Sequence, residues 1–361
     1  MEPQAVPMRM MQADALREFA AAAFRAVGVP ADQAADAAHV LVWANLHGVD
    51  THGVRNLKPF YIDGINNGTI TAAPEFQIEY ETPVTARVSG GNGLGMSGGM
   101  WAMRLAIAKA QASGVGLVAM RNTHHFGAAG CFAMQAIEQD MIGVALTGYM
   151  RPEGMEYGAV PTFGMRPMLS TNPISVAVPT GVELPFLLDM ATTITPMNRV
   201  WLYKELGRTL PLGWGWDADR QPTDDPSAVR MLPPLGGTRE MGSHKGYGLA
   251  MVVEILCAQL SGGWEQTADG RYTQPLNAHF FGAIRVDAFR PLAEFKMGMD
   301  SMIDAIHQAE PAPGHERILV AGDPEHAARA RRSESGIPLP PNVVHDLEAL
   351  AAAYHLPLHW D

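Results

Sequence analysis

A polar stretch near the N-terminus carries the residue types needed to move a proton beside a bound anion. It runs from Leu46 to Arg55 and reads LHGVDTHGVR. His52 has a side chain whose ordinary pKa suits proton transfer near neutral pH, and Arg55 offers a planar fork for a carboxylate. Because these two residues are three apart, they share a face if a helix begins here. A carboxylate clamp beside a proton donor is what reduction of a 2-oxo acid needs, although Asp50 or Thr51 could instead cap an ordinary surface helix.

A second polar cluster directly follows a predicted strand. It spans Asn122 to Gly127 and reads NTHHFG. Loops at the carboxyl ends of strands are where α/β proteins place ligand contacts, so His125 is a candidate for catalysis or substrate binding. A hydrogen-bonded structural role is the alternative. His124 and His125 are adjacent and point in different directions, and no HExxH motif occurs, so we predict no metal site.

Two further stretches combine small polar residues with free backbone N–H groups, which suit a phosphate or a ribose. They span Leu169 to Pro173 and Asp189 to Thr193, and ordinary turns capped by Asn and Asp are the alternative. Asp189 ends an apolar strand, so its carboxylate needs a partner such as a histidine or an amide. Lys245 opens a long predicted helix, where a cation is unfavourable unless an anion binds beside it. It is therefore a candidate contact of a cofactor phosphate.

The elements expected to position these clusters alternate between strands and helices, which is typical of an α/β layer architecture. A helical N-terminal segment and a helical tail flank this centre, so we expect one helical domain built from both termini (1–80 and 318–361) with an α/β domain (81–317) inserted. The predicted helices are 14–26, 31–46, 54–66, 96–112, 128–138, 245–260 and 341–354, and the strands are 85–88, 115–120, 142–147, 174–178, 184–188 and 279–286. Residues 208–243 are rich in Pro, Gly and Asp and are expected to form a long surface loop.

A glycine-rich motif lies between the predicted strand 85–88 and the predicted helix 96–112. Gly93 to Gly98 fits the pattern GxGxxG, follows a predicted strand and opens a helix. The dinucleotide-binding fingerprint also requires an acidic residue after the next strand, but that strand runs into Arg121 with no carboxylate beside it. Glycines also serve as turns and allow close helix packing. We therefore predict that the fold is not a conventional Rossmann fold.

Composition narrows the class of protein. The chain has 361 residues, 47% of them hydrophobic, and a net charge of −11, which disfavours nucleic acid and anionic membranes as partners. An anionic small molecule held by local cations is still compatible. The longest apolar run, 249–260, is too short to span a membrane, and the first residues do not resemble a secretory signal. With Cys131 and Cys257 as the only cysteines, we expect a cytoplasmic protein.

Six motifs in order resemble those of the malate/L-lactate dehydrogenase family that lacks a Rossmann fold. That family also contains ureidoglycolate dehydrogenase, diketogulonate reductase, sulfolactate dehydrogenase and the piperideine- and pyrroline-2-carboxylate reductases. The motifs are THGVR at 51–55, NTHHFG at 122–127, TNP at 171–173, DMAT at 189–192, HKGYG at 244–248 and GHE at 314–316. The resemblance implies a non-Rossmann, mixed-sheet NAD(P)-binding domain inserted into the helical domain. It also implies a homodimer whose active site lies near the subunit junction.

The resemblance assigns a role to each motif. His52, Thr51, His125 and Asp189 match catalytic positions, and Arg55 together with His125 matches substrate contacts. Thr51 stands where the family usually has Ser, so the hydroxyl is kept. The positions that match NAD or NADP contacts are Ser170, Thr171, Asn172, Pro173, Ile174, Asp189, Met190, Ala191, His244, Lys245, Gly314, His315 and Glu316.

The predicted function is hydride transfer between NAD or NADP and the 2-carbon of a small 2-oxo or 2-hydroxy carboxylate. In this scheme His52 moves the proton and Arg55 holds the carboxylate. Reduction of a cyclic imine such as piperideine- or pyrroline-2-carboxylate, with the same carboxylate clamp, is the alternative within the enzyme class. A metal-dependent hydrolase and a non-catalytic protein that binds small acids are alternatives from other classes.

Overall fold

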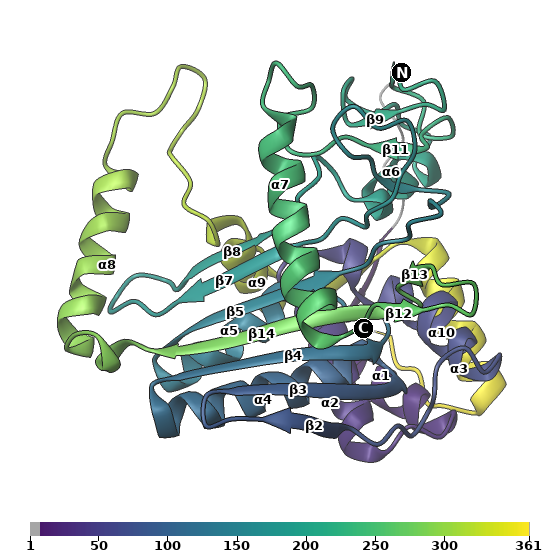
Figure 1. The fold of residues 1–361 in the computed structure, drawn as a ribbon, viewed down its shortest axis with the longest axis horizontal. Coiled ribbons are helices and arrows are strands. Elements are labelled where there is room, and N and C mark those ends of the chain that lie inside the picture. The colour runs from purple at the N-terminus through teal and green to yellow at the C-terminus, as the bar shows by residue number, and fades with distance from the viewer. Residues whose placement is uncertain (1–7, 361) are drawn as a thin grey trace.

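A seven-stranded mixed sheet forms the centre of the computed structural model, which describes residues 8–360 (Figure 1). The strands are β2 (Gln77–Glu81), β3 (Thr85–Gly93), β4 (Val115–Thr123), β5 (Met141–Gly148), β7 (Ile174–Val178), β8 (Phe186–Met190) and β14 (Asn277–Arg285). Their order is β2-β3-β4-β14-β5-β7-β8, and only β3 and β4 are parallel neighbours. The predicted mixed α/β architecture is confirmed.

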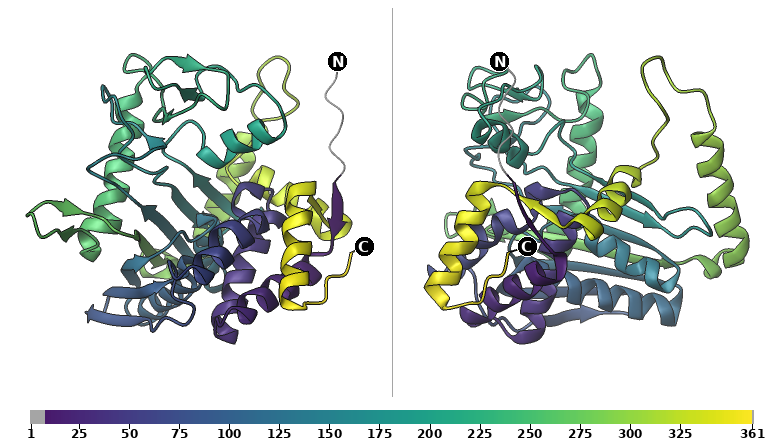
Figure 2. Two further views of the ribbon diagram at one scale, coloured as in Figure 1. Left: turned by 90° about the vertical axis from the view of Figure 1, so that its right-hand side faces the viewer. Right: turned by 180° about the vertical axis from the view of Figure 1, so that it is seen from behind.

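Helices cover both faces of this sheet (Figure 2). One face carries α4 (Gly95–Ser113) and α5 (Ala129–Gln135), and the other carries α7 (Ser243–Glu254) with the π-helical turn Ile255–Gln259. The glycines of the GxGxxG stretch explain how closely α4 approaches its neighbours. A Cβ on Gly95 would lie 2.0 Å from the carbonyl oxygen of His124, and one on Gly98 would lie 2.5 Å from Cε of Met120. These two glycines are buried and serve packing, as the sequence interpretation favoured.

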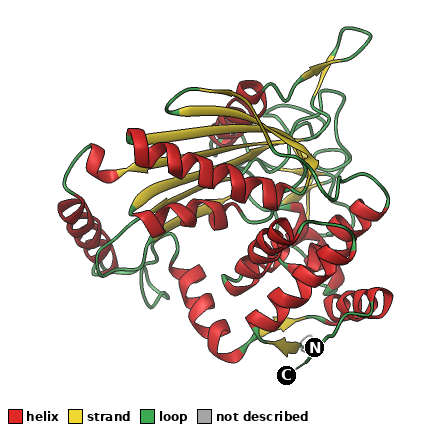
Figure 3. Ribbon diagram, turned by 90° about the horizontal axis from the view of Figure 1, so that it is seen from below, coloured by secondary structure: helices red, strands yellow, loops and turns green. Residues whose placement is uncertain are grey.

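Segments from the two ends of the chain pack together beside the sheet (Figure 3). They are α1 (Ala13–Ala26), α2 (Ala31–Leu46), α9 (Asp323–Ser335) and α10 (Pro341–Tyr354), together with β1 (Arg9–Met11) and β15 (Ile337–Leu339), which pair antiparallel. Leu16, Phe24, Leu41 and Leu347 are each at most 1% exposed and belong to one apolar core. Because α2 also packs on α4, this helical layer is joined directly to the sheet.

The segment 54–66 is not the single helix that was predicted. It contains a 3₁₀ turn (Val54–Asn56), a π turn (Leu57–Ile62) and the short α3 (Asp63–Asn66), and another 3₁₀ turn (Asp50–His52) precedes it. Gly53 separates the two 3₁₀ turns because its backbone is extended, with φ −88° and ψ −154°. The expectation that His52 and Arg55 lie on one helix face is therefore wrong.

Residues 208–243 contain more structure than the predicted loop. Three short strands, β9 (Gly215–Trp216), β10 (Pro222–Thr223) and β11 (Met231–Leu232), join β6 (Gly158–Ala159) in a small four-stranded sheet. Val160, Trp216 and Met231 form a buried apolar cluster, which accounts for the order of this region. The helix α6 (Met197–Glu205), which was not predicted, precedes it.

Two peripheral elements complete the fold. A hairpin pairs β12 (Glu265–Gln266) with β13 (Tyr272–Thr273). The helix α8 (Leu292–His307) stands apart from the body of the molecule (Figure 1), and its Asp300 carboxylate accepts backbone N–H groups of Gly181, Val182 and Glu183 at 2.9–3.2 Å. Within residues 8–360, no helix has the length and apolar character needed to cross a bilayer.

Candidate active site

A cavity of about 690 Å³ lies where the Asp50–His52 turn, the start of α5, the ends of β7 and β8, α6 and α9 meet. Polar residues that are far apart in the sequence therefore share one space. The predicted site residues that line it are Thr51, His52, Thr171, Pro173, Asp189, Met190 and Ala191. Its volume lies within the range of small-molecule and cofactor sites.

His52 is held at the cavity wall by its neighbour in the chain. The hydroxyl of Thr51 lies 2.9 Å from Nδ1 of His52 and forms a hydrogen bond with it. Nε2 of His52 has no hydrogen-bond partner in the described chain and is not enclosed. Burial, His125 and Arg199 together lower the pKa of His52 to about 3, so the ring is neutral at neutral pH. Nε2 can accept a proton in the tautomer in which Nδ1 carries the hydrogen and donates it to the hydroxyl oxygen of Thr51.

His125 lies directly behind His52 and does not line the cavity itself. The two rings are stacked, with centroids 5.5 Å apart. Nδ1 of His125 lies 2.8 Å from the hydroxyl of Tyr61 and 3.3 Å from the backbone nitrogen of Gly127. Because a backbone N–H can only donate, Nδ1 is an acceptor, and the neutral ring carries its proton on Nε2. Burial lowers the pKa of His125 to about 4, which keeps it neutral.

Asp189 is the penultimate residue of β8 and also lines the cavity. Its Oδ2 accepts the backbone N–H of Gly130 at 2.7 Å, in the first turn of α5, which supplies the amide partner that the sequence required. Burial, with a smaller contribution from the nearby Glu325, raises the pKa of Asp189 to about 7, although the hydrogen bond from Gly130 acts in the opposite direction. The carboxyl group therefore titrates close to neutral pH.

Arg55 does not line this cavity. Its guanidinium pairs with Oε1 of Glu205 on α6 at 2.5 Å, and the side chain is 16% exposed. The other oxygen of Glu205 accepts a hydrogen bond from Nδ2 of Asn342 at 3.3 Å. The planar fork that we predicted to hold a substrate carboxylate thus binds a carboxylate of the protein in this structure.

Sequence reasoning missed the cations that do line the cavity. They are Arg199 on α6 and Arg331 and Arg332 on α9. Arg332 binds both carboxylate oxygens of Asp50, at 2.7 and 2.9 Å, and so ties α9 to the turn that carries His52. Within residues 8–360, the side chains of Arg199 and Arg331 make no ion pair with a carboxylate, and both are exposed. Neither helix carried a motif that could have indicated this arrangement.

The helix α6 is fixed beside the turn that carries His52. Nδ2 of Asn198 donates to the backbone oxygen of Thr51 at 2.8 Å. The next residue, Arg199, faces the cavity and is close enough to His52 for its charge to lower the pKa of that ring. The guanidinium of Arg199 lies over the ring of Trp214, 5.8 Å from the ring centroid, and within residues 8–360 it has no carboxylate partner.

Comparison with known proteins identifies the family of this chain. A sequence profile of the family described as malate/L-lactate dehydrogenase matches residues 11–348. This chain belongs to the malate/L-lactate dehydrogenase family. It is 39% identical over 344 residues to a malate dehydrogenase of Pyrococcus abyssi, covering 94% of this chain and 93% of that protein. It is also 36% identical over 330 residues to an L-sulfolactate dehydrogenase of Methanocaldococcus jannaschii, covering 90% and 91%.

The fold of this family member agrees with the same assignment. The crystal structure of malate dehydrogenase from Entamoeba histolytica superposes with a TM-score of 0.90 at 31% identity, covering 98% of this chain and 100% of that one. Membership of the malate/L-lactate dehydrogenase family makes the chain a 2-hydroxy-acid dehydrogenase. Within residues 8–360, no group of three or more His, Cys, Asp or Glu side chains is placed to hold a metal ion.

The wall of the cavity formed by β7 and β8 can be tested against NAD(P), the cofactor of such enzymes. Thr171 and Pro173 line it beside the apolar residues Met190 and Ala191. His47 also lines the cavity, and its ring stacks on that of Trp43 with the centroids 3.8 Å apart. Within residues 8–360, the buried Nε2 of His47 has no hydrogen-bond partner. Because Nδ1 of His47 donates to the backbone oxygen of Trp43, Nε2 is an orphaned acceptor. A flat ring that carries an amide donor, as nicotinamide does, fits this wall.

The remaining cofactor candidates lie elsewhere. Asn172 is fully buried, and its side chain forms hydrogen bonds with protein groups. The backbone N–H of Ser170 donates to the backbone oxygen of Tyr149 at 2.8 Å. Ile174 is the first residue of β7. His244 and Lys245 are exposed in the first turn of α7. The segment 314–316 is exposed in the long connection between α8 and α9. None of these residues lines the cavity that contains His52.

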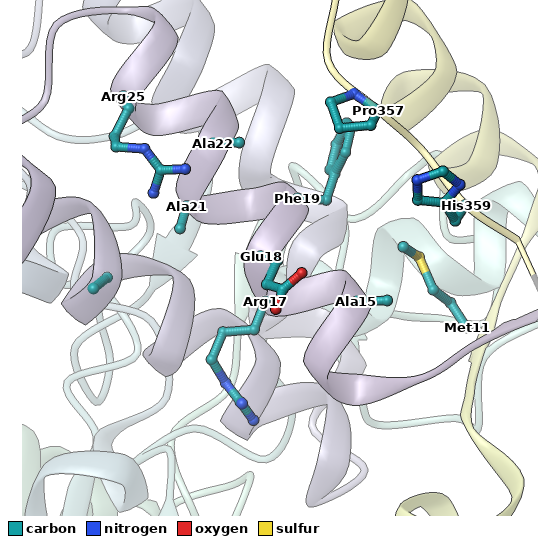
Figure 4. Close-up of a pocket in the computed structure, with 11 residues that line it drawn as sticks. Met11, Ala15, Arg17, Glu18, Phe19, Ala21, Ala22, Arg25, Pro357 and His359 are labelled. Carbon is teal, nitrogen blue, oxygen red and sulfur yellow. The ribbon is translucent and has the colours of Figure 1, made fainter.

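A second cavity, of about 530 Å³, lies along α1 and the C-terminal segment (Figure 4). Arg17, Glu18 and Arg25 of α1 line it, with Pro357 and His359 on the side of the C-terminal segment. It contains none of the predicted site residues. The cavity at His52 is therefore the candidate active site.

Proposed function

We propose that the His52 cavity is where this dehydrogenase interconverts a small 2-hydroxy carboxylate and its 2-oxo form, and that His52 moves the proton. The observation that carries the proposal is the shared cavity, which His52, Asp189 and Arg199 all line. A proton acceptor beside a cation suits a hydroxyl group next to a carboxylate.

The enzyme uses NAD or NADP, which supplies or accepts the hydride at the 2-carbon when bound. Relatives of both kinds are known by name. An NADP⁺-dependent (2R)-3-sulfolactate dehydrogenase of Chromohalobacter salexigens is 32% identical, and an NAD⁺-dependent ureidoglycolate dehydrogenase of Escherichia coli O157:H7 is 27% identical. Thr171, Pro173, Asp189, Met190 and Ala191 would hold the nicotinamide end. His244, Lys245 and the segment 314–316 would contact the remainder of the dinucleotide.

The proton chemistry follows from the state of His52. In oxidation its neutral Nε2 accepts the proton of the 2-hydroxyl group, while Thr51 fixes Nδ1. In reduction the same nitrogen returns the proton to the oxygen on the 2-carbon. A substrate carboxylate in the cavity raises the pKa of His52, against the effect of Arg199, and so favours the protonated ring that reduction requires. His125 supports the ring of His52 from behind.

Arginines in two parts of the protein can bind the acidic groups of the substrate. Arg199 and Arg331 line the cavity without carboxylate partners, so a substrate with two acidic groups can engage both. Malate and sulfolactate, after which the relatives of this chain are named, are acids of that type. Arg55 takes part when the substrate carboxylate replaces Glu205 as the partner of its guanidinium. We therefore favour a 2-hydroxy acid with a second acidic group over lactate.

A panel of substrates tests the proposal. Oxaloacetate, pyruvate, sulfopyruvate and piperideine-2-carboxylate are each offered with NADH and with NADPH, and oxidation of the nucleotide is followed by its absorbance. The proposal expects turnover of a 2-oxo acid, with the diacids favoured through a lower KM. Turnover of the cyclic imine alone would favour the alternative reaction, which is supported by a 26% identical neighbour, the delta1-piperideine-2-carboxylate reductase of Pseudomonas syringae, with a TM-score of 0.79.

The assembly is part of the same proposal. We propose a homodimer, with the active site near the subunit junction, in the cytoplasm. Leu249 and Val252 of α7 and Ile255 of the following π-helical turn form an exposed apolar stripe, and α8 exposes Met297 and Met302. Such surface favours burial against a second copy. Val252→Glu should shift the protein to monomer in sedimentation, whereas Leu212→Glu, which replaces an exposed aliphatic residue elsewhere, should not. A wild-type monomer would rule the dimer out.

A further inference from the structure

A buried carboxylate lies behind the wall of the cavity, where no substrate or cofactor reaches it. Glu254 is the last residue of α7 and is only 2% exposed. Its Oε2 accepts a hydrogen bond from Nδ2 of Asn172 at 3.3 Å, and its Oε1 accepts one from Nε1 of Trp264 at 3.3 Å. Within residues 8–360 no cation pairs with it. A buried carboxylate without a cation is costly, so its retention calls for a function.

Asn172 connects this carboxylate to the cavity. Its backbone has a positive φ of 36°, a conformation that favours Asn over most residues but still needs support from its surroundings. Three contacts besides Glu254 hold it. Nδ2 also donates to the backbone oxygen of Ala250 at 3.1 Å, Oδ1 accepts the N–H of Tyr149 at 3.4 Å, and the backbone oxygen accepts the hydroxyl of Thr192 at 3.1 Å.

The residues on either side of Asn172 face the cavity. Thr171 and Pro173 both line it, and the backbone oxygen of Thr171 accepts hydrogen bonds from the N–H and the hydroxyl of Thr192 at 2.9 Å. Any rotation of the Asn172 backbone would therefore move two wall residues at once. The space for the carboxylate is itself specific, because a Cβ on Gly148 would lie 2.8 Å from Oε2 of Glu254.

We propose that Glu254 is a positioning residue for dinucleotide binding, acting through Asn172 to fix the Thr171–Pro173 wall. This inference rests on the proposed function, since it takes that wall to contact NAD or NADP. Glu254 touches neither the substrate nor the cofactor. Its second partner, Trp264, precedes the β12–β13 hairpin and does not reach the wall, which provides a matched control.

The experiment measures dinucleotide dissociation constants of the full-length protein by NADH and NADPH fluorescence, together with kcat and both KM values. Glu254→Leu and Asn172→Ala should each weaken dinucleotide binding by about tenfold, the usual effect of losing a hydrogen bond to a charged group. KM for the 2-oxo acid should change far less. Glu254→Gln keeps one oxygen, which can accept from Asn172 in place of Trp264, and should restore most of the binding. Trp264→Phe should bind like the wild type. In the double variant of Glu254 and Asn172, the two effects should not add.

A second readout is independent of activity and of folding yield. Amide hydrogen exchange should quicken in the peptides that contain residues 169–174 and 190–193 of Glu254→Leu, while α7 keeps its protection. Equal losses for Trp264→Phe and Glu254→Leu, or unchanged exchange at the wall, would overturn the inference. An inactive wild type would instead contradict the proposed function, whereas an active wild type with normal dinucleotide binding in Glu254→Leu contradicts this inference alone.

Discussion

The rings of His52 and His125 are stacked with their centroids 5.5 Å apart, and only His52 reaches the cavity. This arrangement distinguishes the two histidines, which the motifs alone left as equal candidates. His52 has a free Nε2 at the cavity, whereas His125 is oriented by Tyr61 and Gly127. We therefore assign the proton to His52 and a supporting role to His125.

Removing the hydroxyl of Tyr61 tests that supporting role. Tyr61→Phe leaves the ring in the core but removes the hydrogen bond to Nδ1 of His125. We expect kcat to fall by roughly threefold to tenfold, as for a lost neutral hydrogen bond, with little change in substrate KM. Steady-state kinetics with the preferred 2-oxo acid provide the measurement. A loss as large as that of a His52 variant would show that His125 itself moves the proton.

The pair formed by Arg55 and Glu205 makes a distinct prediction. If substrate has to displace Glu205, then Glu205→Gln removes the competing charge and should lower the KM for the 2-oxo acid by about threefold to tenfold. Arg55→Lys should raise it, because Lys cannot form the two parallel hydrogen bonds. Unchanged KM values in both variants would show that Arg55 serves only to hold α6.

Arg199 should discriminate between diacids and monoacids. Arg199→Gln removes the unpaired cation near His52 and should raise the KM for oxaloacetate by about tenfold or more, with a smaller effect on pyruvate. Arg199→Lys should retain part of the binding. The ratio of kcat/KM for the two acids is the quantity to compare. If the ratio is the same in wild type and Arg199→Gln, the second acidic group binds elsewhere.

The buried carboxyl of Glu254 should make stability depend on pH. Burial raises its pKa from 4.5 to about 7, so between these values the folded state binds the proton that the unfolded chain has lost. The stability that this group contributes is complete below about pH 4.5 and is lost as the pH rises through 7. Relative to Glu254→Gln, the wild type should therefore lose stability between pH 5 and 8. Urea unfolding of both proteins at several pH values measures the difference, and parallel curves would contradict the expected shift.

The elements that could be predicted from the sequence are those whose hydrophobic pattern and bounding turns lie within a few residues of each other. The sequence analysis located α1, α2, β5 and β7 because their apolar patterns and bounding turns are local. It missed α9, whose sequence is dominated by charged residues, and β2, whose five residues are all exposed. Without an apolar stripe there was nothing for a periodicity argument to detect.

In the candidate site as well, residues in local motifs could be predicted, whereas contacts between distant positions could not. Thr51, His52, Thr171 and Asp189 belong to short polar motifs, and the structure brings all four to one cavity. The ion pair between Arg332 and Asp50 joins positions 282 residues apart, so no spacing rule could reveal it. His52 and Arg55 do not share a helix face because the extended backbone at Gly53 interrupts the expected helix, and Asn45 packs closely against Gly53. A Cβ at Gly53 would lie 2.2 Å from Oδ1 of Asn45.

The most direct test of the account is the turnover of the preferred 2-oxo acid by His52→Gln, measured beside His345→Gln, which replaces an exposed histidine on α10. We predict that kcat of His52→Gln falls by ~10²–10⁴, the usual reach of general acid–base catalysis, while NAD(P)H binding stays within about threefold of wild type. His345→Gln should behave as the wild type. A kcat of His52→Gln close to that of the wild type would contradict the assignment of the proton to His52.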